Sequence, residues 1–194
     1  ALRNIRRWAS QAPGLVAESE FQSALLPTVT IRDQYVPYGL VGCISPWNFP
    51  VTLSLIDAVP ALAAGCAVIV KPSEVTPRFV APLQRALLRV PELAAVLAFT
   101  TGAADTGRAL VAEVDVICFT GSVATGRKVA EAAAARFIPA FLELGGKDPA
   151  VVLASADLEM ATDVVLRGAI ANNGHACMSL ERIYVQRPLY ARFV

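Results

Sequence analysis

Short apolar segments alternate with amphipathic segments along most of the chain, and this alternation strongly limits the possible folds. The apolar segments are rich in β-branched residues and read as strands buried on both faces, as in parallel sheets. They cover residues 40–45, 67–70, 96–100, 114–120, 140–144 and 150–153. Amphipathic or alanine-rich segments at 52–64, 77–89, 106–113 and 125–136 predict helices between them. The repeated strand–helix order predicts an α/β fold with an open parallel sheet and flanking helices.

Both ends of the chain depart from this repeat. Residues 1–10 predict a helix, and alternating residues in 28–36 predict an edge strand or arm. Beyond Pro149 we expect a helix over 158–171, a loop that holds Cys177, and a strand over 182–186. A second α/β domain is therefore expected to begin near residue 147.

Composition excludes several classes of protein. The chain has 194 residues, with 17 Lys and Arg against 16 Asp and Glu and no basic cluster, so we expect no nucleic-acid partner. Hydrophobic residues make up 55%, but the longest apolar run, 58–70, is interrupted by Pro60 and Gly65 and is too short to cross a bilayer. No basic segment followed by a cleavage site is present, so no secretory signal is expected.

The four cysteines divide into two kinds. Cys43, Cys66 and Cys118 lie in or beside apolar segments and are expected in the core, whereas Cys177 lies in a polar loop. They show no C-x-x-C spacing and only one His accompanies them, so neither a zinc site nor a disulfide framework is expected. A reducing, cytoplasmic location is the corresponding prediction.

Polar residues and glycines collect where the predicted strands end, which is where open α/β sheets bind ligands. The segment Gly121–Gly126 follows a strand and opens a helix, so its backbone N–H groups suit a pyrophosphate. Its G-x-x-x-x-G spacing is neither the G-x-G-x-x-G pattern nor a P-loop, and a purely local turn explains it equally well. The other strand ends carry Ser45-Pro46-Trp47-Asn48, Lys71-Pro72-Ser73-Glu74, Thr101-Gly102 and Glu143-Leu144-Gly145-Gly146.

For two residues, the local sequence alone suggests a chemical role. Cys177 is accessible in its loop, and His175, two residues earlier, is placed to activate it; the alternative is an inert thiol beside a hydrogen-bonding His. Glu143 ends an apolar segment before two glycines, where enclosed surroundings favour a general base. Its alternative is an ion pair with Lys147 or Arg182.

Taken together, the motifs resemble the aldehyde dehydrogenase superfamily over the whole chain. They occur in the family's order and spacing: Ser45-Pro46-Trp47-Asn48-Phe49-Pro50, Lys71-Pro72-Ser73-Glu74, Phe119-Thr120-Gly121-Ser122 with Gly126, Leu142-Glu143-Leu144-Gly145-Gly146-Lys147, and Gly174-x-x-Cys177. The resemblance implies a Rossmann-like sheet for the central part of the chain. It also implies NAD(P)-dependent oxidation of an aldehyde to a carboxylic acid.

The resemblance assigns roles by residue. It makes Cys177 the nucleophile, Glu143 the general base, and Asn48 with the Cys177 backbone N–H the oxyanion hole. It places Lys71 and Glu74 at the adenosine ribose of NAD, with NADP possible, and Gly121 and Ser122 at the pyrophosphate. The remaining cofactor-binding positions that it implies are Ser45, Pro46, Trp47, Ser73, Gly102, Thr125, Gly126 and Leu144, and no metal is expected.

The resemblance also implies a domain organisation, and the chain departs from the family's pattern at two points. Residues 1–26 would be a helical segment of the coenzyme domain, 27–38 an arm, 39–146 the NAD-binding domain and 147–194 the start of the catalytic domain, in a homodimer or homotetramer. His175 stands where the family usually has Gln. The chain is also shorter than the family's, so we expect a fragment. Two alternatives remain: a non-catalytic nucleotide-binding or oligomer-forming remnant, and a Cys–His hydrolase using Cys177 and His175.

Overall fold

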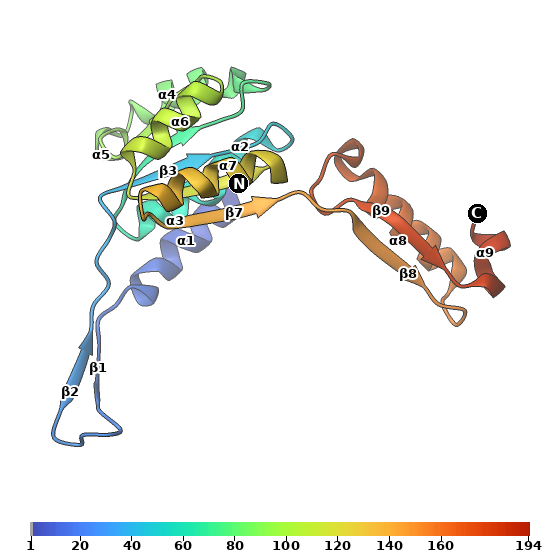
Figure 1. Cartoon of the computed structure of the whole chain (residues 1–194), viewed down its shortest axis with the longest axis horizontal. Helices are drawn as coiled ribbons and strands as arrows, with labels where there is room; N and C mark the ends of the chain where they lie inside the picture. Colours follow the sequence, from blue (N-terminus) through green and yellow to red (C-terminus); the bar gives the residue numbers. More distant parts are fainter. Residues whose placement is uncertain (1) are drawn as a thin grey trace. The chain divides into compact units, whose positions relative to one another are not determined.

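The computed structural model describes residues 2–194 and divides into two compact units, Ala1–Glu143 and Leu144–Val194 (Figure 1). The first unit contains a five-stranded sheet with strand order β5-β4-β3-β6-β7. Its strands are β3 (Leu40–Ile44), β4 (Ala67–Lys71), β5 (Leu97–Phe99), β6 (Val116–Gly121) and β7 (Ala140–Leu144). The pairs β3–β4, β3–β6 and β4–β5 are parallel. The predicted α/β fold with an open parallel sheet is thus confirmed.

The central strands are apolar because helices cover them. Val68 and Val70 of β4 are at most 1% exposed, and Val41 of β3 and Val116 of β6 are also buried. Burial of both faces explains why these strands read as continuous apolar runs in the sequence. The helices of this unit are α1 (Leu2–Leu15), α2 (Pro50–Ile56), α3 (Ala58–Ala63), α4 (Val80–Leu87), α5 (Pro91–Ala94), α6 (Ala104–Glu113) and α7 (Val123–Ala135), with a 3-10 turn, η1 (Pro77–Phe79), before α4.

Prolines account for several differences between the predicted and observed helices. The helix expected over 52–64 is two helices, α2 and α3, that meet at Asp57, and Pro60 lies in the first turn of the second one. A proline tolerates a first turn because its missing N–H has no partner there. Pro77 likewise opens η1, and Pro91 opens α5, which was not predicted.

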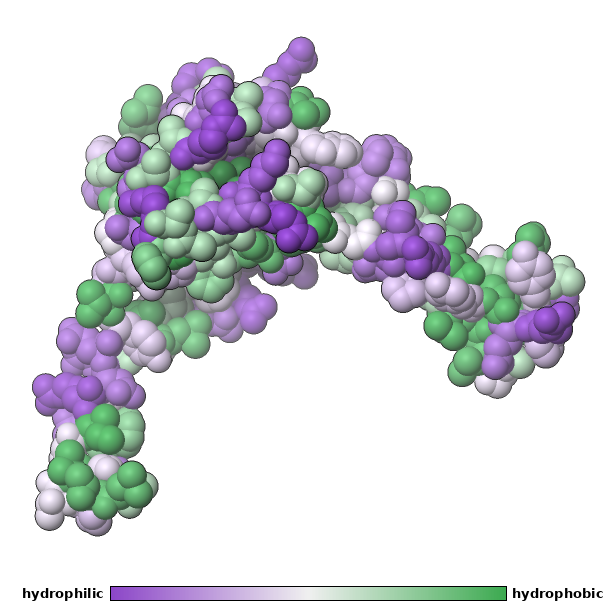
Figure 2. All heavy atoms as spheres, in the orientation of Figure 1, coloured by the Kyte–Doolittle hydropathy of each residue, from purple (hydrophilic) through white to green (hydrophobic). Residues whose placement is uncertain are grey.

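The predicted arm is a two-stranded hairpin. β1 (Ser19–Gln22) pairs antiparallel with β2 (Thr30–Asp33), which is the core of the strand expected over 28–36. β1 was missed because all four of its residues are exposed and its sequence shows no apolar alternation. Hydrophobic side chains gather at the tip of the hairpin (Figure 2), where Leu25 is 90% and Leu26 is 61% exposed.

The second unit has its own small sheet. β8 (Asp148–Val152) and β9 (Leu180–Val185) pair in parallel, connected through α8 (Leu158–Ile170) and η2 (Ala171–Gly174), and α9 (Arg187–Phe193) follows. The strand expected over 150–153 was therefore wrongly placed in the main sheet: it is part of β8 and pairs only with β9. Among the helices described for residues 2–194, none is long and apolar enough to cross a membrane.

Candidate active site

The ends of β3, β4 and β6 lie side by side at one edge of the main sheet. Ile44, the last residue of β3, is in register with Lys71 on one side and with Phe119 on the other. The segments that follow these three strands therefore begin next to one another. Most of the cofactor-binding residues expected from the sequence lie in these segments.

The segment after β3 is fixed to its neighbours. Ser45 is buried, its N–H donates to the Lys71 carbonyl at 3.1 Å, and its hydroxyl shares a 2.6 Å hydrogen bond with that of Ser54 in α2. The Thr76 hydroxyl donates to the Trp47 carbonyl at 3.1 Å. These bonds hold the turn that carries Asn48, a half-buried residue, between β3 and α2.

Lys71 is more enclosed than the sequence suggested. Its ammonium donates to the carbonyls of Pro72 at 2.9 Å and Gly102 at 2.8 Å, and it lies 3.7 Å from the Glu74 carboxylate. Burial lowers the pKa of Lys71, and the Glu74 charge offsets part of that effect. Lys71 thus links the segments after β4 and β5, while the Glu74 side chain is 60% exposed and accessible to a ligand.

Gly102 meets a local requirement of this edge. Its φ is +150°, and a Cβ atom there would lie 2.0 Å from the Thr106 hydroxyl oxygen in α6. Only glycine fits this backbone without moving Thr106. The position of Gly102 in the sequence is therefore explained by packing, and a role toward a cofactor remains a separate proposal.

The turn after β6 is a helix N-cap. The Ser122 hydroxyl accepts a hydrogen bond from the Thr125 N–H at 3.3 Å, and it donates to the Thr125 hydroxyl at 3.0 Å. Gly126 is buried, and its N–H donates to the Ser122 carbonyl at 2.8 Å. A Cβ on Gly121 would lie 2.6 Å from the Phe119 ring. The local explanation of the glycine spacing thus holds, and the positive end of the α7 dipole faces the same edge.

Glu143 is not enclosed by the described residues. It alternates with the half-buried Leu142 and Leu144 along β7 and is exposed. Lys147, one of the two partners considered for it, pairs with Glu181. The apolar surroundings expected for this residue are therefore not supplied by this part of the protein.

Asp57 is a second carboxylate near Glu143. It lies where α2 meets α3 and makes no side-chain capping bond to α3. Burial raises the pKa of Asp57 above its usual 3.8, and the negative charge of Glu143 raises it further. Asp57 has no distinguishing signal in the sequence, because only the fold brings it near Glu143.

The Cys177 loop has an unusual backbone in the second unit. After α8, Asn172, Asn173 and Gly174 have φ values of 52°, 57° and 71°. Asn and Gly are the residues that adopt this conformation most readily. The turn continues with hydrogen bonds from His175 N to the Asn172 carbonyl and from Ser179 N to the Ala176 carbonyl, both 3.0 Å.

Exposure separates the four thiols as the sequence predicted. Cys177 is exposed, Cys43 and Cys66 are buried, and Cys118 is half-buried. Cys43 and Cys118 are register partners on β3 and β6. A hydrogen bond with Cys118, followed by burial, raises the pKa of the Cys43 thiol, so this thiol stays protonated at neutral pH. The four cysteines are free, and no cluster of three or more potential metal ligands occurs in the described chain.

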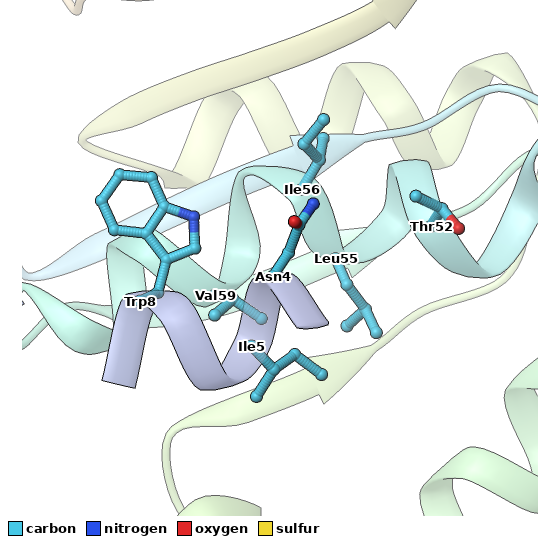
Figure 3. Close-up of a pocket in the computed structure, with 7 residues that line it drawn as sticks. All are labelled: Asn4, Ile5, Trp8, Thr52, Leu55, Ile56 and Val59. Atoms are coloured by element: carbon cyan, nitrogen blue, oxygen red, sulfur yellow. The ribbon is translucent and has the colours of Figure 1, made fainter. Parts of the chain in front are cut away.

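A groove that the sequence analysis missed lies between α1 and the helices after Asn48 (Figure 3). In the sequence, Leu55, Ile56 and Val59 follow Thr52 by three, four and seven residues. This spacing places the four side chains on one helix face. The residues that line it are Asn4, Ile5 and Trp8 of α1, Thr52, Leu55 and Ile56 of α2, and Val59 of α3.

Comparison with known proteins agrees with these motifs. The model of the aldehyde dehydrogenase family matches residues 1–194. The chain belongs to the aldehyde dehydrogenase family. It is 40% identical over 191 residues to a "Putative succinate-semialdehyde dehydrogenase [NADP(+)]" of Mycolicibacterium smegmatis, covering 98% of this chain and 37% of that protein. It is 41% identical to the geranial dehydrogenase of Castellaniella defragrans, covering 98% of this chain and 40% of that protein.

A solved structure supports the same family and fold. The "Putative Aldehyde Dehydrogenase PutA" of Anabaena variabilis is 58% identical and superposes with a TM-score of 0.96, covering 99% of this chain and 41% of that one. The chain therefore spans about two fifths of the length of these members of the aldehyde dehydrogenase family.

Proposed function

We propose that the protein to which this chain belongs oxidises an aldehyde to a carboxylic acid, with NAD or NADP as the acceptor. The observation that carries the proposal is the exposed thiol of Cys177, set in the family's Gly174-x-x-Cys177 motif, while Cys43 and Cys66 are buried. A nucleophilic thiol must be reachable by its substrate, and Cys177 meets this condition.

The proposed steps use three residues of the chain. The Cys177 thiolate attacks the aldehyde carbon and forms a C–S bond, and the carbonyl oxygen becomes an oxyanion. The Asn48 side-chain amide and the Cys177 N–H stabilise that oxyanion, and one such donor lowers a barrier by about 3 kcal/mol. Glu143 takes a proton from the water that later hydrolyses the Cys177 thioester and releases the acid. The exposed carboxylate of Glu143 is accessible to that water.

The edge of the main sheet fits a dinucleotide. Glu74 beyond β4 offers an exposed carboxylate for ribose hydroxyls, and the α7 N-terminus beyond β6 offers N–H groups for a pyrophosphate. The turn of Ser45, Pro46 and Trp47 lies between them because β3 separates β4 from β6. When bound, the dinucleotide supplies the hydride acceptor that makes the oxidation possible. A cytoplasmic homodimer or homotetramer remains part of the proposal.

The test measures reduced dinucleotide formation by the intact protein with an aldehyde, comparing wild type with Cys177→Ala and with Cys66→Ala as the matched control. We expect activity to be lost only in the Cys177 variant, and iodoacetamide to label Cys177 before the other three cysteines. Retained activity in Cys177→Ala would refute the assignment of the nucleophile. If the protein hydrolyses esters but does not oxidise an aldehyde in the presence of NAD or NADP, the Cys–His hydrolase alternative is favoured instead.

A further inference from the structure

Cys43 and Cys118 form a pair of neighbouring thiols inside the main sheet. They are register partners on the adjacent parallel strands β3 and β6, so their side chains lie on the same face of the sheet. A hydrogen bond joins the two thiols. The proposed catalytic cycle uses neither of them.

The spacing of adjacent strands brings the two sulfur atoms within reach of a covalent bond. Neighbouring strands lie about 4.8 Å apart, and the Cα atoms of a disulfide are separated by about 4.4–6.8 Å. The Cβ atoms of a disulfide are closer, at about 3.8 Å. Bond formation therefore requires β3 and β6 to approach each other by about 1 Å, and a bond strained in this way is easily reduced again.

The two thiols differ in their access to solvent. Cys118 is half-buried, whereas Cys43 is 2% exposed in the core cluster that also holds Val41 and Val116. The hydrogen bond with Cys118 and burial raise the pKa of Cys43, so its thiol is protonated at neutral pH. A small oxidant from solvent therefore reaches the sulfur of Cys118 before that of Cys43.

We propose that Cys43 and Cys118 are a reversible redox site, which hydrogen peroxide oxidises to a disulfide between β3 and β6. The Cys118 sulfur attacks one peroxide oxygen, the O–O bond breaks, and the departing hydroxide takes the Cys118 proton. The Cys43 sulfur then attacks the sulfur of the resulting sulfenic acid, the S–O bond breaks, and the departing hydroxide takes the Cys43 proton. Two thiols are thus oxidised to one disulfide, while one hydrogen peroxide is reduced to two water molecules.

The disulfide acts on the sheet edge that the proposed function assigns to the dinucleotide, and this consequence rests on that function. Cys43 lies two residues before Ser45. Cys118 lies three residues before Gly121. Drawing β3 and β6 together therefore displaces the turn after β3 relative to the N-terminus of α7. A displacement of about 1 Å can cost about a hundredfold at a well-positioned site, and since the sheet absorbs part of it, NAD should bind about tenfold more weakly after oxidation.

The experiment uses the intact protein carrying Cys177→Ala, which removes the exposed thiol that would also react with peroxide. After treatment with hydrogen peroxide, the remaining thiols are alkylated in denaturant, and mass spectrometry of a digest identifies linked peptides. We expect a Cys43–Cys118 link that dithiothreitol removes. If both cysteines stay open to alkylation while peroxide oxidises Cys177 in the wild type, or if they are oxidised without forming the link, the redox site is overturned.

Single substitutions in the same background locate the effect. Cys43→Ala and Cys118→Ser should each abolish the link and the rise in the NAD Kd after peroxide, whereas Cys66→Ala, which removes a buried thiol outside the pair, should retain both. The Kd values come from fluorescence titration. Each variant is compared with itself before and after peroxide, so a loss of stability common to both states cancels.

The outcomes separate the redox site from the proposed function. A Cys43–Cys118 link that leaves the NAD Kd unchanged would overturn the coupling to the dinucleotide edge. Failure of the reduced protein to bind NAD or NADP would overturn the proposed function, while formation of the link would still support the redox site.

Discussion

Glu74 is the residue on which the proposed choice between NAD and NADP rests. Its carboxylate is 60% exposed and lies 3.7 Å from the Lys71 ammonium. At the proposed position it would accept the ribose hydroxyls of NAD and repel a 2′-phosphate. The nearby cation and the solvent weaken this repulsion, so we expect NAD to be preferred by only about tenfold. Glu74→Gln should lower the ratio of the Kd for NADP to the Kd for NAD, mainly by strengthening the binding of NADP.

The measurement is the Kd of each dinucleotide at low and high salt. Glu92→Gln, which changes a carboxylate on α5 instead, serves as the control and should not alter the ratio. Equal Kd values for NAD and NADP in the wild type at low salt, where charge repulsion is least screened, would show that Glu74 is not at the ribose.

Asp57 predicts a dependence of stability on pH. Its folded pKa is raised above 3.8 by burial and then by Glu143, so the native state holds this proton more tightly than the unfolded state does. The contribution of Asp57 to the free energy of unfolding therefore falls as pH rises from about 3.8 through the raised pKa, and the full penalty persists above it. Asp57→Asn should remove that penalty and gain stability relative to wild type across this window.

The test is to measure the free energy of unfolding of wild type and Asp57→Asn by urea titration between about pH 4 and about pH 8, the range in which a carboxyl group with a raised pKa loses its proton. Asp105→Asn is a suitable control, because the Asp105 side chain is 92% exposed and pairs with Arg108 on the same helix. If the stability difference between wild type and Asp57→Asn does not change with pH, Asp57 is not held in its native surroundings as the structure describes.

At the scale of elements, the chain offers two helices with the same kind of N-cap. Ser122 caps α7 through Thr125 N, and Asp157 caps α8 through Met160 N. Ser122→Ala and Asp157→Ala should each lower the free energy of unfolding by about 1 kcal/mol. Only the first should also weaken NAD binding, because α7 alone is proposed to face the pyrophosphate.

Comparing Ser122→Ala with Asp157→Ala therefore separates a general loss of stability from a loss of NAD affinity. Unfolding free energies come from urea titration and the NAD Kd from fluorescence titration. Equal weakening of NAD binding by both variants would argue that the cap acts through stability and that the α7 N-terminus does not bind the pyrophosphate.

An element could be predicted where its burial leaves a pattern in its own sequence. The strands β3, β4 and β6 were recognised because both of their faces are buried, which leaves a continuous apolar run. The same run at 150–153 could not reveal its partner, and the structure pairs it with β9. β1 has four exposed residues and carries no such pattern.

Candidate site residues could be predicted from the sequence where they follow single elements. Ser122, Glu74 and Cys177 became candidates because each belongs to a local motif at the end of an element, and their roles stay predictions. The Lys71 bond to Gly102 and the α1–α2 groove were not found, because they join segments far apart in the sequence. Glu143 is exposed among the described residues because β7 is an edge strand of the main sheet, and its role as a base stays a prediction.

At the scale of the whole molecule, the proposed chemistry draws on both units. Glu143 ends the first unit, while Cys177 lies in the second. If Cys177 forms the thioester and Glu143 only activates the water that hydrolyses it, the two residues act at separate steps of one cycle. Removing Glu143 should therefore stop turnover after the first oxidation and leave that oxidation intact.

We expect Glu143→Gln to give a burst of NADH close to one per active site, followed by steady turnover reduced at least about a hundredfold. Rapid mixing of the intact protein with aldehyde and NAD measures both phases. Adding Glu143→Gln to Cys177→Ala should cause no further loss, because without the thiol no thioester forms for Glu143 to act on. Glu113→Gln, a change at the end of α6, should show wild-type kinetics in both phases. Loss of the burst in Glu143→Gln would place Glu143 at the first step, and a second decrease in the double variant would show that it acts independently of Cys177.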